Sequence, residues 1–453
     1  MPADVVVAAL AALAVGWGVV LLLPGVTTGR VDWLLAGGVA AGAGVFTALV
    51  AGWLDDLALL ILAVPLPALV STDAVRVSAP LLASVLVVGA WALRRPGPGR
   101  PLRLGSLPVL PGVALLAAMG VSTLGAAEPG AAVRELANVV LLGALLVAAT
   151  DALAGRPDRV VRLAWVLAGA GGAAGLAGGL EAAGILPGTY ALFGSSLFRA
   201  GGGFGQPNGL GMFLALCVPF AAFTWTTARP GGPRVAAGVL GMCLGVGLVS
   251  TFSRGSWVTV ILAPAVLLLV GDWRTVLRFA LLAALGAVIV DVASGGAVSG
   301  RVVASLEDPS ALQRLALMGA GGLMALDHPL LGVGPGGFGV ALEEYGLLVP
   351  GLWDFVPSAH NAYIHMAAET GLVGLLPYLV LVGTVGWRLL MRAREVRGGA
   401  EGVLARCLLW AWATAVVLGL FEWTLVHGAA QVILLVVAMG MAERADRATA
   451  PAP

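Results

Sequence analysis

Polar side chains gather in one stretch near the C-terminal end of this very apolar chain, FVPSAHNAYIHMAAETGLVG, residues 355–374. Asn361, His365 and Glu369 follow one another at four-residue steps, so a helix carries them on one face. His360 stands at or before the start of that helix. An imidazole is a suitable general base near neutral pH. His360 is therefore a candidate catalytic residue, whereas His365, deeper in the helix, is expected to bond Asn361 or Glu369.

The same stretch raises the alternative of a metal site. His365 and Glu369 have the i, i+4 spacing of two ligands on a helix, but no third ligand stands at a recognisable spacing. Asp327 and His328 precede a proline in a predicted loop. We therefore expect no metal and no other cofactor, and the remaining interpretation is a polar seam between helices.

Two further stretches combine an arginine with turn residues. FRAGGGFGQPNGLG places Arg199 before a glycine-rich run whose glycines allow close backbone approach to a ligand, and Asn208 indicates a helix start. TFSRGSW places Arg254 between two apolar runs, where its charge must reach the membrane surface or find a partner. Each arginine alone also suits an anchor to lipid headgroups. The pair favours an anion site, because guanidinium groups donate bidentate hydrogen bonds to phosphate.

A fourth stretch, LGVGPGGFG at residues 331–339, is rich in glycine and resembles a phosphate-cradling loop in composition. A nucleotide-binding fingerprint requires a strand before such a loop and a helix after it. Because these flanks are missing, a plain turn is the favoured interpretation.

These polar stretches are exceptions in a chain suited to a membrane. Of its 453 residues, 59% are hydrophobic and 11% are charged, with a mean hydropathy of +0.99, whereas soluble domains carry about 25% charged residues. Apolar runs recur from Val5 to Met441, and about 20 such residues span the hydrocarbon. We expect an all-α, polytopic transmembrane protein of about 12 to 14 helices, forming a single integral membrane domain over residues 1–453.

The apolar runs define candidate membrane spans along the whole chain. They lie near residues 4–23, 33–52, 57–70, 77–93, 106–126, 132–150, 163–183, 208–226, 235–251, 255–270, 278–293, 361–388, 403–421 and 428–442.

Arginines predict which connections face the cytoplasm. All 25 basic residues are arginines, and 18 of them fall in alternate connections, at residues 94–103, 156–162, 229–234, 274–278, 388–406 and 444–447. The intervening connections hold the other seven. By the positive-inside rule both termini are expected in the cytoplasm.

This topology places three polar, glycine-bearing connections on the outer side: residues 186–208, the turn at 251–255, and the longest connection, 294–360. In the last one, apolar residues recur at near-helical spacing between Ser310, a suitable N-cap, and Pro329. The sequence thus predicts a large outer loop that contains a helix lying at the membrane surface.

Together, these stretches resemble the O-antigen ligase and O-antigen polymerase superfamily of bacterial membrane glycosyltransferases. That family shows an arginine followed by G-x-F-x-x-P-N-x-L-G, an S-R-G turn, a loop motif hP-hhG-hG-x-x-x-F that leads to H-N-x-Y, and then E-x-G-hhG. In this chain, Arg199 and residues 202–211 match the first motif, and residues 253–255 match the S-R-G turn. Residues 329–338 match the loop motif, residues 360–363 match H-N-x-Y, and residues 369–374 match the last motif. The resemblance covers roughly residues 134–374.

The resemblance implies a GT-C-like multi-pass enzyme of the bacterial inner membrane, whose outer loop is periplasmic. It would take a glycan from an undecaprenyl-pyrophosphate-linked donor and join it, without a metal, to the hydroxyl of a glycan, lipid or protein acceptor. Arg199 and Arg254 would hold the pyrophosphate, His360 would orient or deprotonate the acceptor, and Arg314 could assist. We also expect a substrate-binding contribution from Asn208, Asn361, Gly202 and Gly205.

Several alternatives stay open at the sequence level. A polysaccharide polymerase and a protein O-oligosaccharyltransferase share these motifs and differ in their acceptors. A secondary transporter or lipid-linked glycan flippase would need charges at mid-membrane depth. Here the charges stand at span ends, with Glu181 and Glu422 the nearest to exceptions, so transport is the weaker interpretation. Membrane lipids are expected partners, and nucleic acids are not.

Overall fold

The computed structural model describes residues 43–52, 54–66, 68–71, 76–94, 102–187, 190–191, 198–303, 309–345, 358–424 and 429–442. These residues fall into two compact units. The first comprises residues up to 63 together with 68–102, and the second comprises 64–67 and all residues from 103 onward. The candidate span at 4–23 lies outside the described residues. The expectation that a single membrane domain covers the whole chain stays a prediction.

The first unit holds helical residues 43–50, α3 (Asp56–Ala63), an antiparallel hairpin of β1 (Ala68–Ser71) and β2 (Arg76–Ser78), and α4 (Ala79–Arg94). An ion pair between Arg94 and Asp56 joins α4 to α3. The predicted span at 57–70 is wrong, because the helix ends at Ala63. The physical reason is Pro65, which lacks an amide hydrogen and disfavours helical geometry in the residue before it.

The second unit is built from helices that coincide with the candidate spans from residue 106 onward. They are α5 (Val109–Leu124), α6 (Pro129–Leu153), α7 (Pro157–Ala182), α8 (Pro207–Thr227), α9 (Gly232–Ser250), α10 (Arg254–Leu262) with the 3-10 helix η2 (Ala263–Val270), α11 (Trp273–Ala293), α15 (Ala362–Glu395), α16 (Gly399–Leu418) and α17 (Ala429–Ala442).

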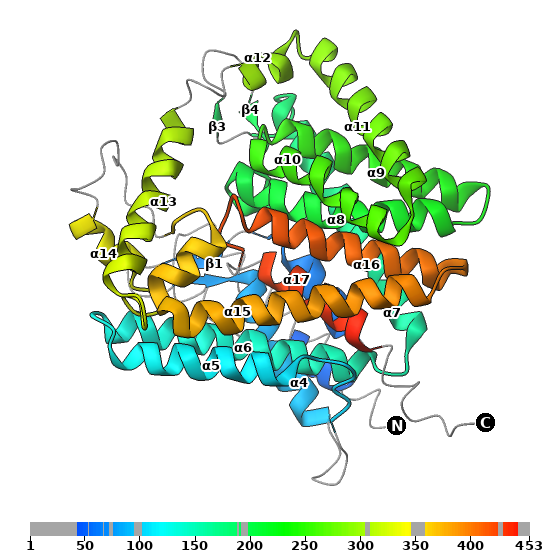
Figure 1. Cartoon of the computed structure of the whole chain (residues 1–453). Coiled ribbons are helices and arrows are strands. Elements are labelled where there is room, and N and C mark those ends of the chain that lie inside the picture. The colour runs from blue at the N-terminus through cyan, green and yellow to red at the C-terminus, as the bar shows by residue number, and fades with distance from the viewer. Residues whose placement is uncertain are drawn as a thin grey trace, which may run out of the picture. The chain divides into compact units, whose positions relative to one another are not determined.

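Shorter elements fill the connections. Strands β3 (Tyr190–Ala191) and β4 (Phe198–Arg199) pair before the 3-10 helix η1 (Gly202–Phe204). Helices α12 (Ala297–Val303), α13 (Pro309–Asp327) and α14 (Phe338–Tyr345) occupy the predicted outer loop. The helix expected between Ser310 and Pro329 is therefore present. In Figure 1, α15 and α16 run side by side, and α13 and α14 lie near the start of α15.

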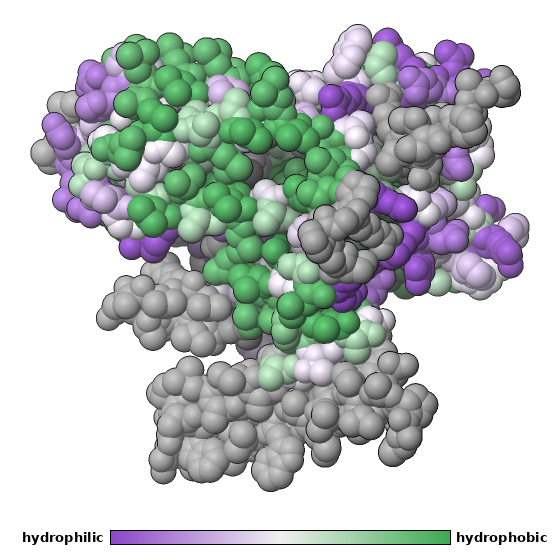
Figure 2. Space-filling model, turned by 90° about the horizontal axis from the view of Figure 1, so that it is seen from below, coloured by the Kyte–Doolittle hydropathy of each residue, from purple (hydrophilic) through white to green (hydrophobic). Residues whose placement is uncertain are grey.

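Helix length and composition confirm an all-α polytopic membrane protein. Seven of the described helices are long and apolar enough to cross a membrane, and four shorter apolar helices accompany them. Figure 2 shows one face on which hydrophobic residues cover a broad central area while hydrophilic residues gather to its left and right. An exposed apolar area of this kind is what lipid-facing helices present to the hydrocarbon.

Glycines allow the central helices to pack closely. Most residues of α8 are buried, and α7 lies against both α8 and α9. A methyl group on Gly175 of α7 would lie 2.4 Å from the carbonyl oxygen of Cys243 in α9, and one on Gly247 would lie 2.3 Å from the Cα of Gly175. Backbones that approach this closely require small residues, as is common between membrane helices.

The connections of the second unit lie alternately at two ends of its helices. At one end, which we call the arginine end, neighbouring connections contact each other: the Arg103 amide donates to Asp151, Arg394 to the Leu269 carbonyl, and Arg406 pairs with Asp272. The other, the motif end, holds η1, the starts of α8, α10 and α15, and the ends of α9 and α16. The arginine-rich connections are therefore separated from the motif-bearing ones. The expectation that the arginine end faces the cytoplasm stays a prediction.

Candidate functional site

Glu422, just beyond the end of α16, bridges two of the predicted site residues. Its Oε2 lies 2.7 Å from Nδ1 of His360, and its Oε1 lies 2.6 Å from Nη2 of Arg314. The three side chains are mostly but not fully enclosed, with 12% of Glu422, 21% of His360 and 27% of Arg314 exposed. The bridge joins α13 to the residues just before α15 and just after α16, which are far apart in the sequence.

The start of α15 fixes the backbone of His360. Asn361 is the N-cap, and its side-chain oxygen accepts hydrogen bonds from the amides of Tyr363 and Ile364, both at 3.0 Å. Its amide group donates to the Leu420 carbonyl at 3.2 Å, which ties the helix start to the end of α16. His360 itself has φ 49°, a strained conformation for a residue with a side chain.

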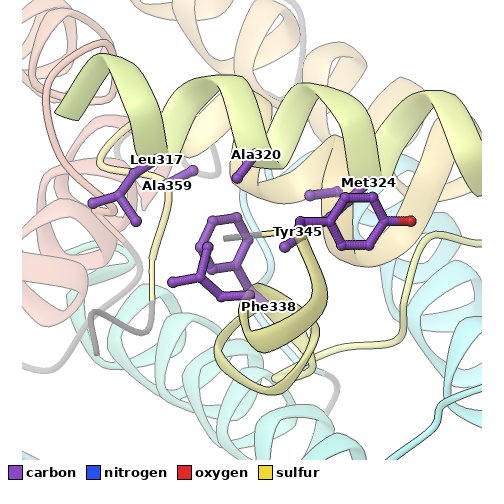
Figure 3. Close-up of a cluster of buried hydrophobic side chains, with 8 residues drawn as sticks. Leu317, Ala320, Met324, Phe338, Tyr345 and Ala359 are labelled. Atoms are coloured by element: carbon purple, nitrogen blue, oxygen red, sulfur yellow. The ribbon is translucent and has the colours of Figure 1, made fainter. Parts of the chain in front are cut away.

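A buried cluster positions Arg314 relative to His360. Figure 3 shows Leu317, Ala320 and Met324 of α13 pointing toward Phe338 and Tyr345 of α14, with Ala359 at the edge. Arg314 is one turn before Leu317, and Ala359 immediately precedes His360. The cluster therefore fixes both site residues at once, because close-packed side chains leave the two segments little freedom.

The hydroxyl of Tyr345 completes the contact between α13 and α14. It donates to Asp327 at the end of α13, at 2.9 Å. Burial of the phenol, together with this hydrogen bond, raises the pKa of Tyr345 to about 12. The hydroxyl therefore stays protonated and keeps donating at any physiological pH.

The loop LGVGPGGFG is a turn attached to α15. The amides of Gly336 and Phe338 donate to the two oxygens of the buried Glu369 carboxylate, at 2.9 and 3.2 Å. At Gly371, with φ 59°, α15 kinks, and a methyl group there would lie 2.3 Å from the backbone of Leu330. The loop is therefore a turn, as expected, and a carboxylate of the protein itself takes up its amides. The expectation that no helix follows it is wrong, because α14 begins at Phe338.

His365 lies in the core, where sequence reasoning expected it. Its Nε2 is 3.4 Å from Glu369 Oε1, and its Nδ1 accepts from the Ala359 amide at 3.4 Å. The ring stacks against Trp423, with ring centroids 4.3 Å apart. Only 3% of His365 is exposed, so an acceptor from solution has no direct access to it. Within the described residues, no three His, Cys, Asp or Glu side chains are grouped as metal ligands.

The second half of the site surrounds Arg199. Its Nε donates to the Thr251 carbonyl at 3.1 Å, and its Nη2 donates to Asn208 Oδ1 at 3.4 Å. The Ala200 amide donates to the Ser250 carbonyl at 2.9 Å. The first arginine stretch is therefore held directly against the turn that carries Arg254.

Glu181, at the end of α7, shapes the glycine loop. One of its carboxylate oxygens accepts from the amides of Gly201 and Gly202, both at 2.9 Å. Gly202 and Gly205 have φ 52° and 63°, the left-handed region that favours glycine. This loop leads into α8, which begins at Pro207, and the start of a helix favours an anion.

Arg254 is the first residue of α10, and its neighbour connects the two halves of the site. A methyl group on Gly255 would lie 3.0 Å from Cβ of Phe421, and Phe421 immediately precedes Glu422. Phe252, in the same turn, has φ 49°; it and His360 are the two residues other than glycine with positive φ in the described part of the chain. Both strained positions lie in the stretches that sequence reasoning singled out.

The structure thus groups the predicted residues into two sets that meet at Gly255 and Phe421. Arg199, Arg254, Asn208 and the glycines form one set, and His360, Asn361 and Arg314 form the other. Sequence reasoning missed the roles of Glu181 and Glu422 and treated them only as charges near the membrane interior. The signal was there, because an ionisable residue within an apolar run usually has a specific partner.

This arrangement suits proton transfer beside an anion. If Nδ1 of His360 donates its hydrogen to Glu422, Nε2 keeps a lone pair and can accept a proton. The arginines of the other set carry fixed positive charge that suits phosphate oxygens. A base and an anion-binding group at one end of a helix bundle are the parts that acyl, phosphoryl or glycosyl transfer needs.

Comparison with known proteins finds a family similarity for part of this arrangement. Among curated proteins, none matches the chain. A family model described as O-antigen ligase matches residues 237–379, a segment that contains Arg254, Arg314 and His360 and excludes Arg199 and Glu422. The match supports the family that the motifs predict: over residues 237–379, this chain is similar to the O-antigen ligase family.

Proposed function

We propose that the protein is a membrane glycosyltransferase of the O-antigen ligase type. It transfers a glycan from undecaprenyl pyrophosphate to an acceptor hydroxyl on the periplasmic face of a bacterial inner membrane, without a metal ion. The observation that carries this proposal is the Glu422 carboxylate, which holds His360 and Arg314 together. It supports a base of defined orientation within a segment that matches the O-antigen ligase model.

His360 acts as the base in this proposal. Glu422 accepts the Nδ1 hydrogen, which leaves Nε2 to take the proton of the acceptor hydroxyl. The acceptor oxygen then forms a bond to the anomeric carbon of the donor sugar, and the bond from that carbon to the pyrophosphate oxygen breaks. The proton ends on His360, and the electron pair of the broken bond leaves with the lipid pyrophosphate.

The two arginines stabilise the leaving group. Negative charge grows on the pyrophosphate as its bond to the sugar breaks, and positive groups fixed in advance lower the energy of that state. The bonds of Arg199 to Thr251 and Asn208 fix its direction. Arg254 begins α10, where the helix dipole also favours an anion.

The contacts of the two outlying carboxylates weigh against transport. Glu422 binds His360 and Arg314, and Glu181 binds the amides of Gly201 and Gly202. Both are therefore used within the site at the motif end. A growing glycan, a lipid or a protein hydroxyl would each suit the proposed chemistry, so a ligase, a polymerase and a protein O-oligosaccharyltransferase differ only in the acceptor.

Purified protein, supplied with lipid-linked donor and an acceptor, tests the proposal. We expect His360→Ala to abolish most transfer at a normal protein level, and His360→Gln to fail as well, because an amide cannot exchange the proton. His365→Ala is the matched control and should mainly lower stability. EDTA should leave the rate unchanged. An active His360→Ala beside an inactive His365→Ala would show that the wrong histidine was assigned.

A further inference from the structure

A pocket at the arginine end, on the opposite side of the helix bundle from the proposed site, has the composition of an anion site. Its volume is about 630 Å³, and it lies where η2, α11, α15 and α16 meet. Four arginines line it: Arg274, Arg394, Arg397 and Arg406. Asp272 is the one acid among its described lining residues, so positive charge dominates the pocket.

Backbone carbonyls hold several of these arginines in place. Nε and Nη2 of Arg394 both donate to the Leu269 carbonyl, at 3.3 and 3.2 Å. Arg397 donates to the Arg394 carbonyl, and Arg406 to that of Arg397, both at 3.2 Å. Carbonyl oxygens fix a guanidinium without neutralising it. The Arg406 to Asp272 pair, at 3.2 Å, removes one charge, and the others remain available to attract an anion.

An apolar stripe begins next to this pocket. No residue of α11 is buried, and Leu277, Leu281 and Leu285 are 48%, 62% and 57% exposed. Their i, i+4, i+8 spacing puts them on one face of the helix. At the start of α11, Trp273 is 56% exposed, and the Arg274 guanidinium lies 5.7 Å from the centre of its ring. Tryptophan in this position is typical of the boundary between hydrocarbon and headgroups.

We propose that this pocket and stripe bind an anionic phospholipid. The arginines take the phosphate and headgroup, since guanidinium groups form bidentate hydrogen bonds to phosphate. The stripe on α11 takes the acyl chains. A free phosphate ion would use the arginines and leave the stripe unexplained, and a second copy of the chain would use the stripe and leave the arginines unexplained. A basic pocket between membrane helices is a recognised setting for anionic headgroups.

Native mass spectrometry of the purified full-length protein, titrated with phosphatidylglycerol or phosphatidylcholine, tests the proposal. We expect tighter binding of phosphatidylglycerol. The double variant Arg274→Ala with Arg397→Ala should weaken that binding by roughly 25-fold and leave phosphatidylcholine unaffected, since each arginine near a membrane surface contributes roughly fivefold. The matched control, Arg162→Ala with Arg229→Ala, removes two exposed arginines outside both the pocket and α11 and should bind as the wild type does.

Further experiments distinguish a phospholipid from the other possible occupants of the pocket and stripe. The variant Arg274→Lys with Arg397→Lys keeps the charge and should retain part of the preference, which guards against a folding defect in the alanine variant. Displacement of phosphatidylglycerol by millimolar inorganic phosphate would overturn the proposal in favour of a free anion. A disulfide-linked dimer formed by Leu281→Cys in membranes would overturn it in favour of a second copy. Equal loss of binding in the control variant would also overturn it.

Discussion

The two oxygens of the Glu422 carboxylate have different partners, and in the proposed reaction this division orients the base. One oxygen faces Nδ1 of His360 and the other faces Arg314. The arginine offsets the carboxylate charge, while the histidine gains a fixed ring orientation. A carboxylate that orients an imidazole in this way acts through the base and does not touch the reacting atoms. In the proposed function, Glu422 is therefore a positioning residue.

Replacing Glu422 by Gln keeps its size and removes one acceptor. A glutamine cannot accept from both His360 and Arg314, because one of its two terminal groups is a donor. We expect kcat to fall by about 100-fold with little change in the KM for the donor. The control is Glu401→Gln, an exposed carboxylate at the start of α16. A normal kcat for Glu422→Gln would mean that the carboxylate does not orient the base.

The two arginines are expected to act as a unit on the pyrophosphate. Arg199→Ala and Arg254→Ala should each nearly abolish transfer, and the double variant should be little worse than either single one. Lysine should rescue poorly because it lacks the bidentate fork. Arg134→Ala, an exposed arginine at the start of α6, is the control. Full activity of both alanine variants at a normal protein level would identify the arginines as lipid anchors.

The residues of the site were predictable to different degrees. His360 and Asn361 stand out because polar side chains and a helix start coincide within a few residues. Arg199 and Arg254 stand out because they lie in glycine-bearing turns. Glu422 pairs with a residue 62 positions away, and such a contact depends on how α15 and α16 pack. A single sequence shows that Glu422 is charged, but it does not show which residue pairs with it.

At the scale of elements, the kink in α15 and the loop before α14 form one structural unit. The amide of Val333 donates to the Ala368 carbonyl, and Gly334 to that of Glu369, at 2.9 and 3.0 Å. After the kink, the amide of Leu372 donates to the Pro329 carbonyl at 2.8 Å. The residues around Gly371 therefore bond to the loop where the helix cannot satisfy its own backbone.

Gly371→Ala tests this unit. The new methyl group would meet the Leu330 backbone at 2.3 Å, and an alanine at φ 59° costs about 1 to 3 kcal/mol before any overlap. We expect a lower melting temperature and a lower protein level in membranes. The control is Gly383→Ala in the same helix, where nothing lies within 4 Å of the added carbon. Wild-type stability of Gly371→Ala would show that the kink can relax.

Helices were the most predictable elements, because long apolar runs leave the backbone no other way to satisfy its hydrogen bonds in lipid. Their interruptions were less predictable. Pro65 ends one expected span, and Pro264 coincides with the change from α10 to η2. The attachment of the loop at 331–339 to Glu369 also escaped prediction, since glycine spacing does not show which group takes up the loop amides.

Across the whole chain, the placement of the arginines predicts which end of the helices faces the cytoplasm. The second unit separates its arginine-bearing connections from the motifs. Positive loops are retained in the cytoplasm during insertion. The proposed function and this rule therefore require the same orientation, although they rest on different residues.

Reporter fusions test this orientation directly. Residues 98, 158, 231 and 397 lie within the arginine-rich connections, and we expect a cytoplasmic signal from a fusion at each. Residues 200 and 345 lie within connections that carry the motifs, and fusions there should report the periplasm. Paired reporters, one active only in the cytoplasm and one only in the periplasm, serve as mutual controls at every position. A cytoplasmic signal at 345 would place His360 and Arg314 on the side away from an outward-facing donor. The proposed transfer reaction would then be excluded, because its base could not meet a lipid-linked glycan on the outer face of the membrane.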